Sequence, residues 1–284
     1  MSHLCFDVSI EDAIAHVVLS RPEKRNSMVP EFWEELPAIV SDIDQNARAR
    51  VIVISSTGPH FTAGLDVSSF SGESLLPGST NDPELARMQR GAQLYATITR
   101  LQKTFTALEA CRLPVLVAIQ GGCIGGGVDL ITACDMRYAT EDAFITIFET
   151  NIGMTADVGT FPRISKLIPD GLARELAFTG RRMPAQEAAA IGLVNRVFPS
   201  HDEMLKGVME VAQDIAAKAP LTLYGVKRMM NHARDHSTAD SLDYIATWNA
   251  SMLHLEEIGE AMAANAEQRP GKFAPLPRTV KSAH

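Results

Sequence analysis

The chain has 284 residues, of which 46% are hydrophobic and 21% charged, and its formal net charge at pH 7 is −8. This composition predicts a globular protein with a sizeable core, and the acidic balance argues against a nucleic-acid-binding surface, where Lys and Arg would cluster. No apolar run approaches the length of a membrane span, and no basic segment followed by an apolar one opens the chain. We therefore expect a cytoplasmic protein with neither nucleic acid nor a membrane as its partner.

Apolar patterning predicts strands joined by helices, followed by a long helical run. Residues 4–10 and 13–19 alternate like the strands of a hairpin, and the continuous apolar runs at 51–55 and 114–119 are typical of buried strands. Further short strands are expected at 135–140, 143–147 and 194–197. Helices are expected at 30–46, 84–111, 159–168, 171–179, 184–191, 201–218, 220–235 and 237–265, and another is expected to begin at 128.

This order of elements predicts an α/β protein with a parallel sheet. We assign the α/β core to residues 1–200 and a helical C-terminal region to residues 201–270. The last segment, 271–284, is expected to be a loosely ordered tail.

The four cysteines form no C-x-x-C pair and have no histidine at metal-ligand spacing. They are Cys5, Cys111, Cys123 and Cys134. We expect them to be buried free thiols, and we expect no metal site.

A glycine-rich segment, GGCIGGG at 121–127, lies between a predicted strand and a predicted helix. It fits neither a dinucleotide fingerprint, because Leu130 takes the place of the third glycine, nor a P-loop, because Val128 and Asp129 follow it. Glycines let a ligand approach the backbone, and the first N–H groups of a helix are unsatisfied donors with partial positive charge. The segment therefore favours an anion site such as an oxyanion hole. Alternatively, the glycines serve only tight packing of helix on strand.

A second loop, FTAGLD at 61–66, also follows a predicted buried strand. Loops at the carboxyl ends of parallel strands meet at one edge of a sheet, so this loop is placed to supply a second donor.

Together, FTAGLD at 61–66 and GGCIGGGVD at 121–129 resemble the crotonase (enoyl-CoA hydratase/isomerase) family, and the similarity runs from about residue 5 to residue 265. Other features agree with it, namely Arg21-Pro22, Asn26, Asp135 with Arg137, Gly153 and AAAIGLVNRV at 188–197. The resemblance implies a crotonase-like α/β superhelix of ββα repeats with a helical C-terminal region. It also implies an acyl-CoA thioester substrate, packing into a homotrimer or a dimer of trimers, and no cofactor beyond the coenzyme A of the substrate.

The resemblance also assigns backbone and binding roles. By motif position, the N–H groups of Leu65 and Gly126 are the implied oxyanion donors. The residues implied near the substrate and its coenzyme A are Lys24, Arg25, Ala63, Gly64, Leu65, Asp66, Val67, Ser68 and Gly127.

Three acids narrow the resemblance to one branch. Hydratases of the family have glutamates at the positions of Asp129 and Glu149, and they commonly have a small residue at the position of Asp157. The acids here, with the strings QKTFT at 102–106 and SLDYIATWN at 241–249, resemble the branch that isomerises 3,5-dienoyl-CoA to 2,4-dienoyl-CoA, a reaction of fatty-acid β-oxidation. That branch implies Asp157 as the base at C2 and Glu149 as the acid at C6. Asp129 would polarise a water or orient its neighbours.

Other interpretations stay open at this point. The family also includes 2-enoyl-CoA hydratases and Δ3-Δ2-enoyl-CoA isomerases, and a non-catalytic acyl-CoA binder would keep the same fold. A carboxyl that donates a proton needs a raised pKa, for which we expect an apolar pocket formed by Phe148, Ile152 and Met154.

Five side chains outside the motifs are expected to have structural or surface roles. We expect Lys227 and Arg228 on a surface face, with coenzyme A phosphates as their alternative ligand. His60 is expected to be structural or solvated. Tyr244 and Trp248, one helical turn apart, are expected in the core or at an interface rather than in an acyl pocket.

Overall fold

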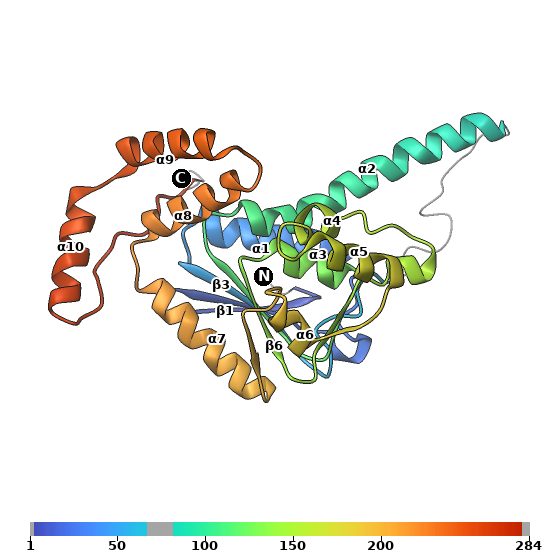
Figure 1. The fold of residues 1–284 in the computed structure, drawn as a ribbon, viewed down its shortest axis with the longest axis horizontal. Coiled ribbons are helices and arrows are strands. Elements are labelled where there is room, and N and C mark those ends of the chain that lie inside the picture. The colour runs from blue at the N-terminus through green and yellow to red at the C-terminus, as the bar shows by residue number, and fades with distance from the viewer. Residues whose placement is uncertain (1–2, 67–81, 280–284) are drawn as a thin grey trace.

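The main sheet of the molecule has six strands in the order β1-β2-β3-β4-β6-β9. The computed structural model describes residues 3–66 and 82–279 (Figure 1). Only β1 pairs antiparallel, with β2, and every later neighbour is parallel. The strands are β1 (Phe6–Glu11), β2 (Ile14–Leu19), β3 (Val51–Ser56), β4 (Val115–Ile119), β6 (Met136–Thr140) and β9 (Arg196–Phe198). The carboxyl ends of the parallel strands therefore share one edge, where sites of such sheets form.

A second, smaller sheet has the order β5-β7-β8. Its strands are β5 (Gly122–Ile124), β7 (Phe144–Thr146) and β8 (Met183–Pro184). Thr62 extends it by a parallel bridge to Cys123. A short strand thus follows β4 and β6 before the chain turns into helix, and this is the ββα repeat that the family resemblance implied.

Helices cover both faces of the main sheet (Figure 1). Helix α7 packs Met204, Val208 and Ala212 against one face, while α1, α2 and α3 lie over the other. Two 3-10 helices are η1 (Pro22–Lys24) and η3 (Glu149–Ile152). The α-helices are α1 (Pro30–Gln45), α2 (Pro83–Ala110), α3 (Gly126–Ala133), α4 (Thr160–Ile164), α5 (Asp170–Thr179), α6 (Ala185–Ala190), α7 (His201–Ala216), α8 (Pro220–Ala233), α9 (Thr238–Met252) and α10 (Leu255–Ala266).

Helix α1 shows how the sequence determines these elements. Pro30 opens it, at a position where the missing N–H has no intrahelical partner to lose. Phe32, Leu36, Ile39 and Ile43 recur at helical spacing and are all buried. In the described part of the chain, no helix combines the length and apolar character that crossing a bilayer requires. The four cysteines are buried free thiols, as predicted.

Two predicted boundaries were wrong. The helix expected to begin at 128 begins at Gly126, and the residues before it form strand β5. The single helix expected at 237–265 is two helices, because Leu253 and His254 both adopt extended backbone between α9 and α10. Neither Gly nor Pro stands at 253–254, so local sequence carries no signal for this break.

The tail is not loosely ordered as far as residue 279. Leu276 is buried, and the Arg50 guanidinium donates to the Phe273 carbonyl at 2.8 Å. Arg112 donates to the Pro277 carbonyl at 2.8 Å. The partners that hold the tail lie far away in sequence, because both arginines belong to the first half of the chain.

The prediction that Lys227 lies on the surface was wrong, because the residue is buried and only 6% exposed. Its Nζ lies 2.8 Å from Asp135 Oδ2 and donates to the carbonyls of Leu108 and Leu113 at 2.8 and 2.9 Å. These partners compensate for its lost hydration. Lys227 thereby ties α8 to the end of α2 and the start of β4, while its neighbour Arg228 is exposed as expected.

We expect Lys227→Met to lower the free energy of unfolding by roughly 3 kcal/mol, because it leaves the partly buried Asp135 carboxylate without its cation. The matched control is Arg228→Met on the same helix, which should lower it by no more than about 1 kcal/mol. Urea denaturation followed by circular dichroism measures both. Equal losses in the two variants would contradict the anchoring role of Lys227.

Candidate active site

The loop after β3 is held by backbone hydrogen bonds to the segment that follows η1. Ala63 N–H donates to the Arg25 carbonyl at 2.9 Å, and Met28 N–H donates to the Gly64 carbonyl at 2.8 Å. Asp66 N–H donates to the Met28 carbonyl at 3.1 Å. The position of this loop is therefore fixed by main-chain atoms.

This loop touches the glycine turn after β4, and at Gly64 only glycine fits the contact. Gly64 has φ +79°, and a Cβ there would lie 2.5 Å from the Ile124 carbonyl oxygen and 3.2 Å from Gly126 N. A Cβ on Gly126 would lie 2.9 Å from Met28 Sδ and 3.8 Å from Leu65 N. The missing side chains thus bring the two backbones together at the edge of the sheet.

Two backbone donors lie at this contact. Within the ranges 3–66 and 82–279, neither Leu65 N–H nor Gly126 N–H donates a hydrogen bond. Gly126 is the first residue of α3, where N–H groups have no intrahelical acceptor and the helix end carries partial positive charge. Both residues line one cavity, of about 370 Å³. The pair is suited to hold an oxygen that gains negative charge.

The cavity is apolar except for three acids, one arginine and one threonine. Its apolar wall includes Trp33, Leu101, Ile124, Phe148, Ile152 and Met154. Asp129, Glu149 and Asp157 all line it, so the structure brings together the three acids that the sequence singled out. The expected apolar pocket of Phe148, Ile152 and Met154 is part of the same cavity.

Asp129 is the most deeply buried of the three acids. It lies in the first turn of α3, has no exposed surface, and accepts a hydrogen bond from Thr160 N–H at 2.6 Å through Oδ1. Its Oδ2 has no hydrogen-bond partner in the described part of the chain. Burial raises its pKa to about 7, and the nearby charge of Glu149 adds to the shift.

Glu149 follows β7 and opens η3. Its Oε1 would lie 3.2 Å from a Cβ on Gly125, so the carboxyl group rests against the glycine turn beside Gly126. Burial raises its pKa, and the charge of Asp157 adds to the effect.

Asp157 lies in the loop between η3 and α4 and is more exposed than the other two acids. The Gln102 side chain on α2 donates to its backbone carbonyl at 2.7 Å, while Asp129 holds Thr160 three residues further on. Burial against the cavity wall raises its pKa. The loop that carries Asp157 is therefore held at Asp157 itself and at its C-terminal end.

The residues implied near coenzyme A are only partly at the cavity. Ala63 and Leu65 line it, and Lys24 and Arg25 are exposed beside the same loop. Val67 and Ser68 lie outside the described residues. Gly127 faces inward, because a Cβ there would lie 2.6 Å from the Thr62 methyl group, so its missing side chain serves packing.

The structural role expected of His60 is confirmed, the two aromatic residues of α9 do not line the cavity, and one cavity residue was missed. His60 accepts a hydrogen bond from Gly122 N–H at 3.0 Å and is structural. Trp248 packs edge-on against Tyr224 at 5.1 Å, in the C-terminal helices and not at the cavity. Sequence reasoning missed Arg182, which lines the cavity with its guanidinium 4.3 Å above the Phe144 ring. No local motif marks it.

Comparison with known proteins agrees with this geometry. The family model for enoyl-CoA hydratase/isomerase matches residues 9–275, and the chain belongs to that family. It is 44% identical over 265 residues to the mitochondrial Δ(3,5)-Δ(2,4)-dienoyl-CoA isomerase of Rattus norvegicus, covering 93% of this chain and 80% of the relative. It is 41% identical to the peroxisomal Δ(3,5)-Δ(2,4)-dienoyl-CoA isomerase of Arabidopsis thaliana, covering 94% of each.

The crystal structure of an enoyl-CoA hydratase from Polaromonas sp. JS666 has the same fold, with a TM-score of 0.82 and 26% sequence identity. The match covers 95% of this chain and 99% of that one. The predicted family and the crotonase-like fold are therefore confirmed.

The raised pKa of Asp129 has a consequence for stability. Between pH about 4 and about 7 the unfolded chain has released this proton while the folded chain keeps it, so the folded protein loses stability as the pH rises. Asp129→Asn removes this dependence. We expect the stability of the variant relative to the natural protein to rise by up to about 4 kcal/mol across that window. Denaturation curves at pH 4 and pH 8 measure the change, and a constant difference would contradict it.

Proposed function

We propose that the protein converts 3,5-dienoyl-CoA thioesters to their 2,4-dienoyl isomers. One observation carries the proposal, namely that three carboxyl groups with raised pKa values share an apolar cavity with two free backbone donors. The names of the relatives from Rattus norvegicus and Arabidopsis thaliana support it. Such a site can take a proton at one carbon and return one at another.

In the proposed reaction Asp157 removes a proton from C2, and the electron pair spreads over the diene and the thioester oxygen. Leu65 N–H and Gly126 N–H stabilise that oxygen, and the loss of one such donor typically costs about 2.7–4 kcal/mol of barrier. Glu149 then gives its proton to C6, which leaves double bonds at C2 and C4. The burial that raises the pKa of Glu149 keeps that proton available. Before the next turnover, the proton on Asp157 must return to Glu149.

We assign Asp129 a positioning role. Its Oδ1 accepts from Thr160 N–H, at the first residue of α4, and so holds the loop of Asp157 against α3. A hydratase would use the carboxyl at this position on water, and here one of its oxygens already has a backbone partner. This contact supports a positioning role for Asp129.

The proposed chemistry consists of two proton transfers with no change of oxidation state. We therefore propose that it needs no metal or redox cofactor, with coenzyme A entering as part of the substrate. Activity that persists after dialysis against a chelator tests this point. We also propose a cytoplasmic location, to be tested by fractionation of the source cells, although the relatives are named as mitochondrial and peroxisomal proteins.

We expect Glu149→Gln and Asp157→Asn each to lower kcat by at least about 100-fold, because each removes one proton-transfer group. Binding of a saturated acyl-CoA, measured by calorimetry, should persist in both. Glu141→Gln is the matched control, since that exposed glutamate follows β6 outside the cavity and should leave kcat unchanged. Unchanged turnover in both site variants would show that the protein is a binder and not this enzyme.

Absorbance distinguishes the proposal from the other reactions of the family. Isomerising a 3,5-dienoyl-CoA brings the diene into conjugation with the thioester and creates a chromophore, whereas hydrating a 2-enoyl-CoA destroys one. Rapid hydration of 2-butenoyl-CoA, with 3,5-dienoyl-CoA left unchanged, would overturn the assignment.

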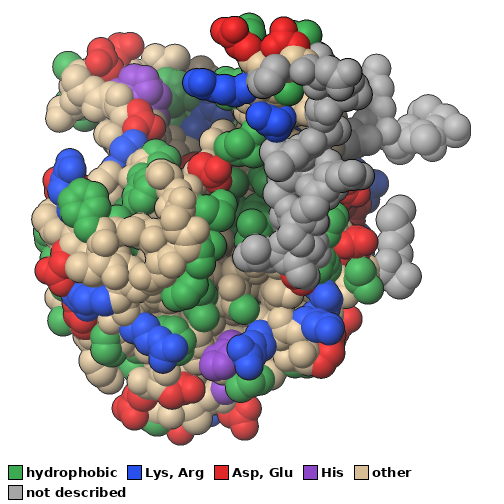
Figure 2. Space-filling model, turned by 90° about the vertical axis from the view of Figure 1, so that its right-hand side faces the viewer, with side chains coloured by type: hydrophobic (Ala, Val, Ile, Leu, Met, Phe, Trp, Pro, Cys, Tyr) green, Lys and Arg blue, Asp and Glu red, His purple; other side chains and the backbone are tan. Residues whose placement is uncertain are grey.

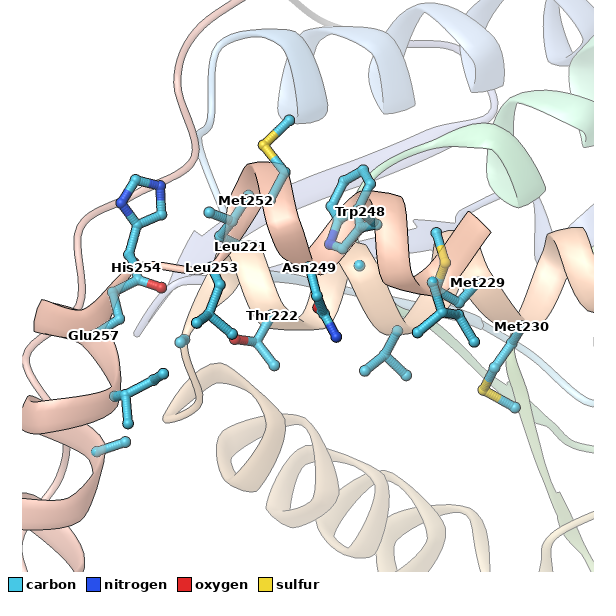
Figure 3. A pocket seen from close by; sticks show the side chains of 16 residues that line it. Leu221, Thr222, Met229, Met230, Trp248, Asn249, Met252, Leu253, His254 and Glu257 are labelled. Atoms are coloured by element: carbon cyan, nitrogen blue, oxygen red, sulfur yellow. The ribbon is translucent and has the colours of Figure 1, made fainter. Parts of the chain in front are cut away.

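We further propose that the C-terminal helices pack against other copies of the chain in a homotrimer or a dimer of trimers. Helices α8, α9 and α10 enclose an apolar groove of about 500 Å³ (Figure 3). Met230 at the rim of this groove is 66% exposed, and Leu255 and Met262 nearby are 77% and 68% exposed. Apolar surface of this extent is typical of an interface.

The double variant Met230→Glu, Leu255→Glu should shift the protein to a smaller assembly in light scattering, because each change buries a charge at the proposed contact. Lys206→Glu, on exposed surface of α7, is the control and should keep the assembly. A monomer for the natural chain at micromolar concentration would contradict the proposal.

A further inference from the structure

A second hollow, of about 430 Å³, lies directly beside the catalytic cavity. It is formed by the segment after η3 and by helices α4 and α5. Phe161 and Ile164 contribute its wall on α4, and Ala173, Ala177 and Phe178 contribute its wall on α5. The reaction proposed above does not use this hollow.

The hollow and the catalytic cavity adjoin each other. Met154 and Thr155 line both. Met154 is 44% exposed, so these residues form an open ridge and not a buried partition. Thr150, the residue after Glu149, also lines the hollow and donates to the Ala177 carbonyl at 2.7 Å. The hollow therefore begins one residue beyond the acid that faces the cavity.

Large apolar side chains around this ridge are exposed. Phe178 is 72% exposed, and Ile152 and Phe148 are 48% and 41% exposed. Hydrophobic side chains gather at the centre of the face shown in Figure 2, the face of the molecule on which α5 lies in Figure 1. Exposed apolar surface next to a site indicates that a ligand or partner covers it.

We propose that this hollow binds the distal methylene chain of a long-chain dienoyl-CoA, an inference that rests on the proposed isomerase function. The thioester is held at Leu65 and Gly126, and Glu149 acts at C6. The carbons beyond C6 then leave the cavity on the far side of Glu149, over Met154 and Thr155. That route ends in the hollow, so the protein is a long-chain enzyme.

A charged pair at the start of α5 limits the length of chain that the hollow accepts. Asp170 and Arg174 line the hollow and are joined at 2.6 Å. Asp170 lies seven residues from Ala177, or about 10 Å along the helix at its usual rise. Each methylene buried along this stretch adds binding free energy. A methylene at the ion pair adds none, because contact with charged groups does not stabilise apolar groups.

The test compares two substrates, 3,5-octadienoyl-CoA and 3,5-tetradecadienoyl-CoA. Burial of one methylene is worth about 0.8 kcal/mol, or up to about fourfold in kcat/KM, so the natural protein should prefer the longer substrate by at least about tenfold. Ser165 is exposed and lines the hollow, and Ser165→Trp fills it. The ratio of the two kcat/KM values should fall by about tenfold or more in that variant.

Ser251→Trp is the matched control. Ser251 is exposed on α9 and bonds to the carbonyl four residues before it, as Ser165 does, but it does not line the hollow. Its variant should keep the ratio of the natural protein. Circular dichroism and light scattering of both variants verify fold and assembly.

The outcomes separate this inference from the proposed function. If the natural protein isomerises neither substrate, the proposed isomerase function is wrong. If it isomerises both without preference, or if Ser165→Trp leaves the ratio unchanged, the acyl subsite is overturned while the isomerase stands. If Ser165→Trp changes the size of the assembly and leaves the ratio unchanged, the hollow contacts a second copy of the chain, which also overturns the subsite.

Discussion

The site depends on the contact of two backbone loops at Gly64 and Gly126. Strands β3 and β4 are parallel neighbours, so their carboxyl ends lie one strand spacing apart. The glycines allow the remaining approach, because a Cβ at Gly64 would lie 2.5 Å from the Ile124 carbonyl oxygen. The two N–H donors are consequently positioned by the sheet and need no side chain. A donor pair fixed in this way requires no reorganisation when charge develops on the bound oxygen.

The acids pose the opposite physical problem, since the fold must bury groups that prefer water. Asp129 has no exposed surface, and one of its oxygens lacks a hydrogen-bond partner in the described ranges. Such burial reduces the stability of the charged form, and it raises the pKa of Asp129, Glu149 and Asp157 together. Proton transfer near neutral pH requires those raised pKa values. Burial of the acids therefore lowers the stability of the fold while it enables catalysis.

Local sequence predicted the features that local physics determines. The hairpin, the buried strands and α1 follow from apolar spacing. The two motif loops indicated the donors and Asp129, whereas Glu149 and Asp157 were assigned from the family resemblance. The predictions failed at positions whose structure is determined by contacts with residues far away in the sequence. Burial of Lys227 depends on Asp135, 92 residues away, and the break at Leu253 follows from no local signal. Arg182 reaches the cavity only because β8 pairs with β7, so no motif identifies it.

The C-terminal segment carries a further consequence for how the molecule is made. Arg50 and Arg112, from the first half of the chain, are hydrogen-bonded to the carbonyls of Phe273 and Pro277 near its end. Thr279 N–H also donates to the Gln45 carbonyl at 2.9 Å. During synthesis these two arginines therefore have no acceptor until residues 273–277 have been made. Folding can begin earlier, but these contacts form only once that C-terminal segment is available.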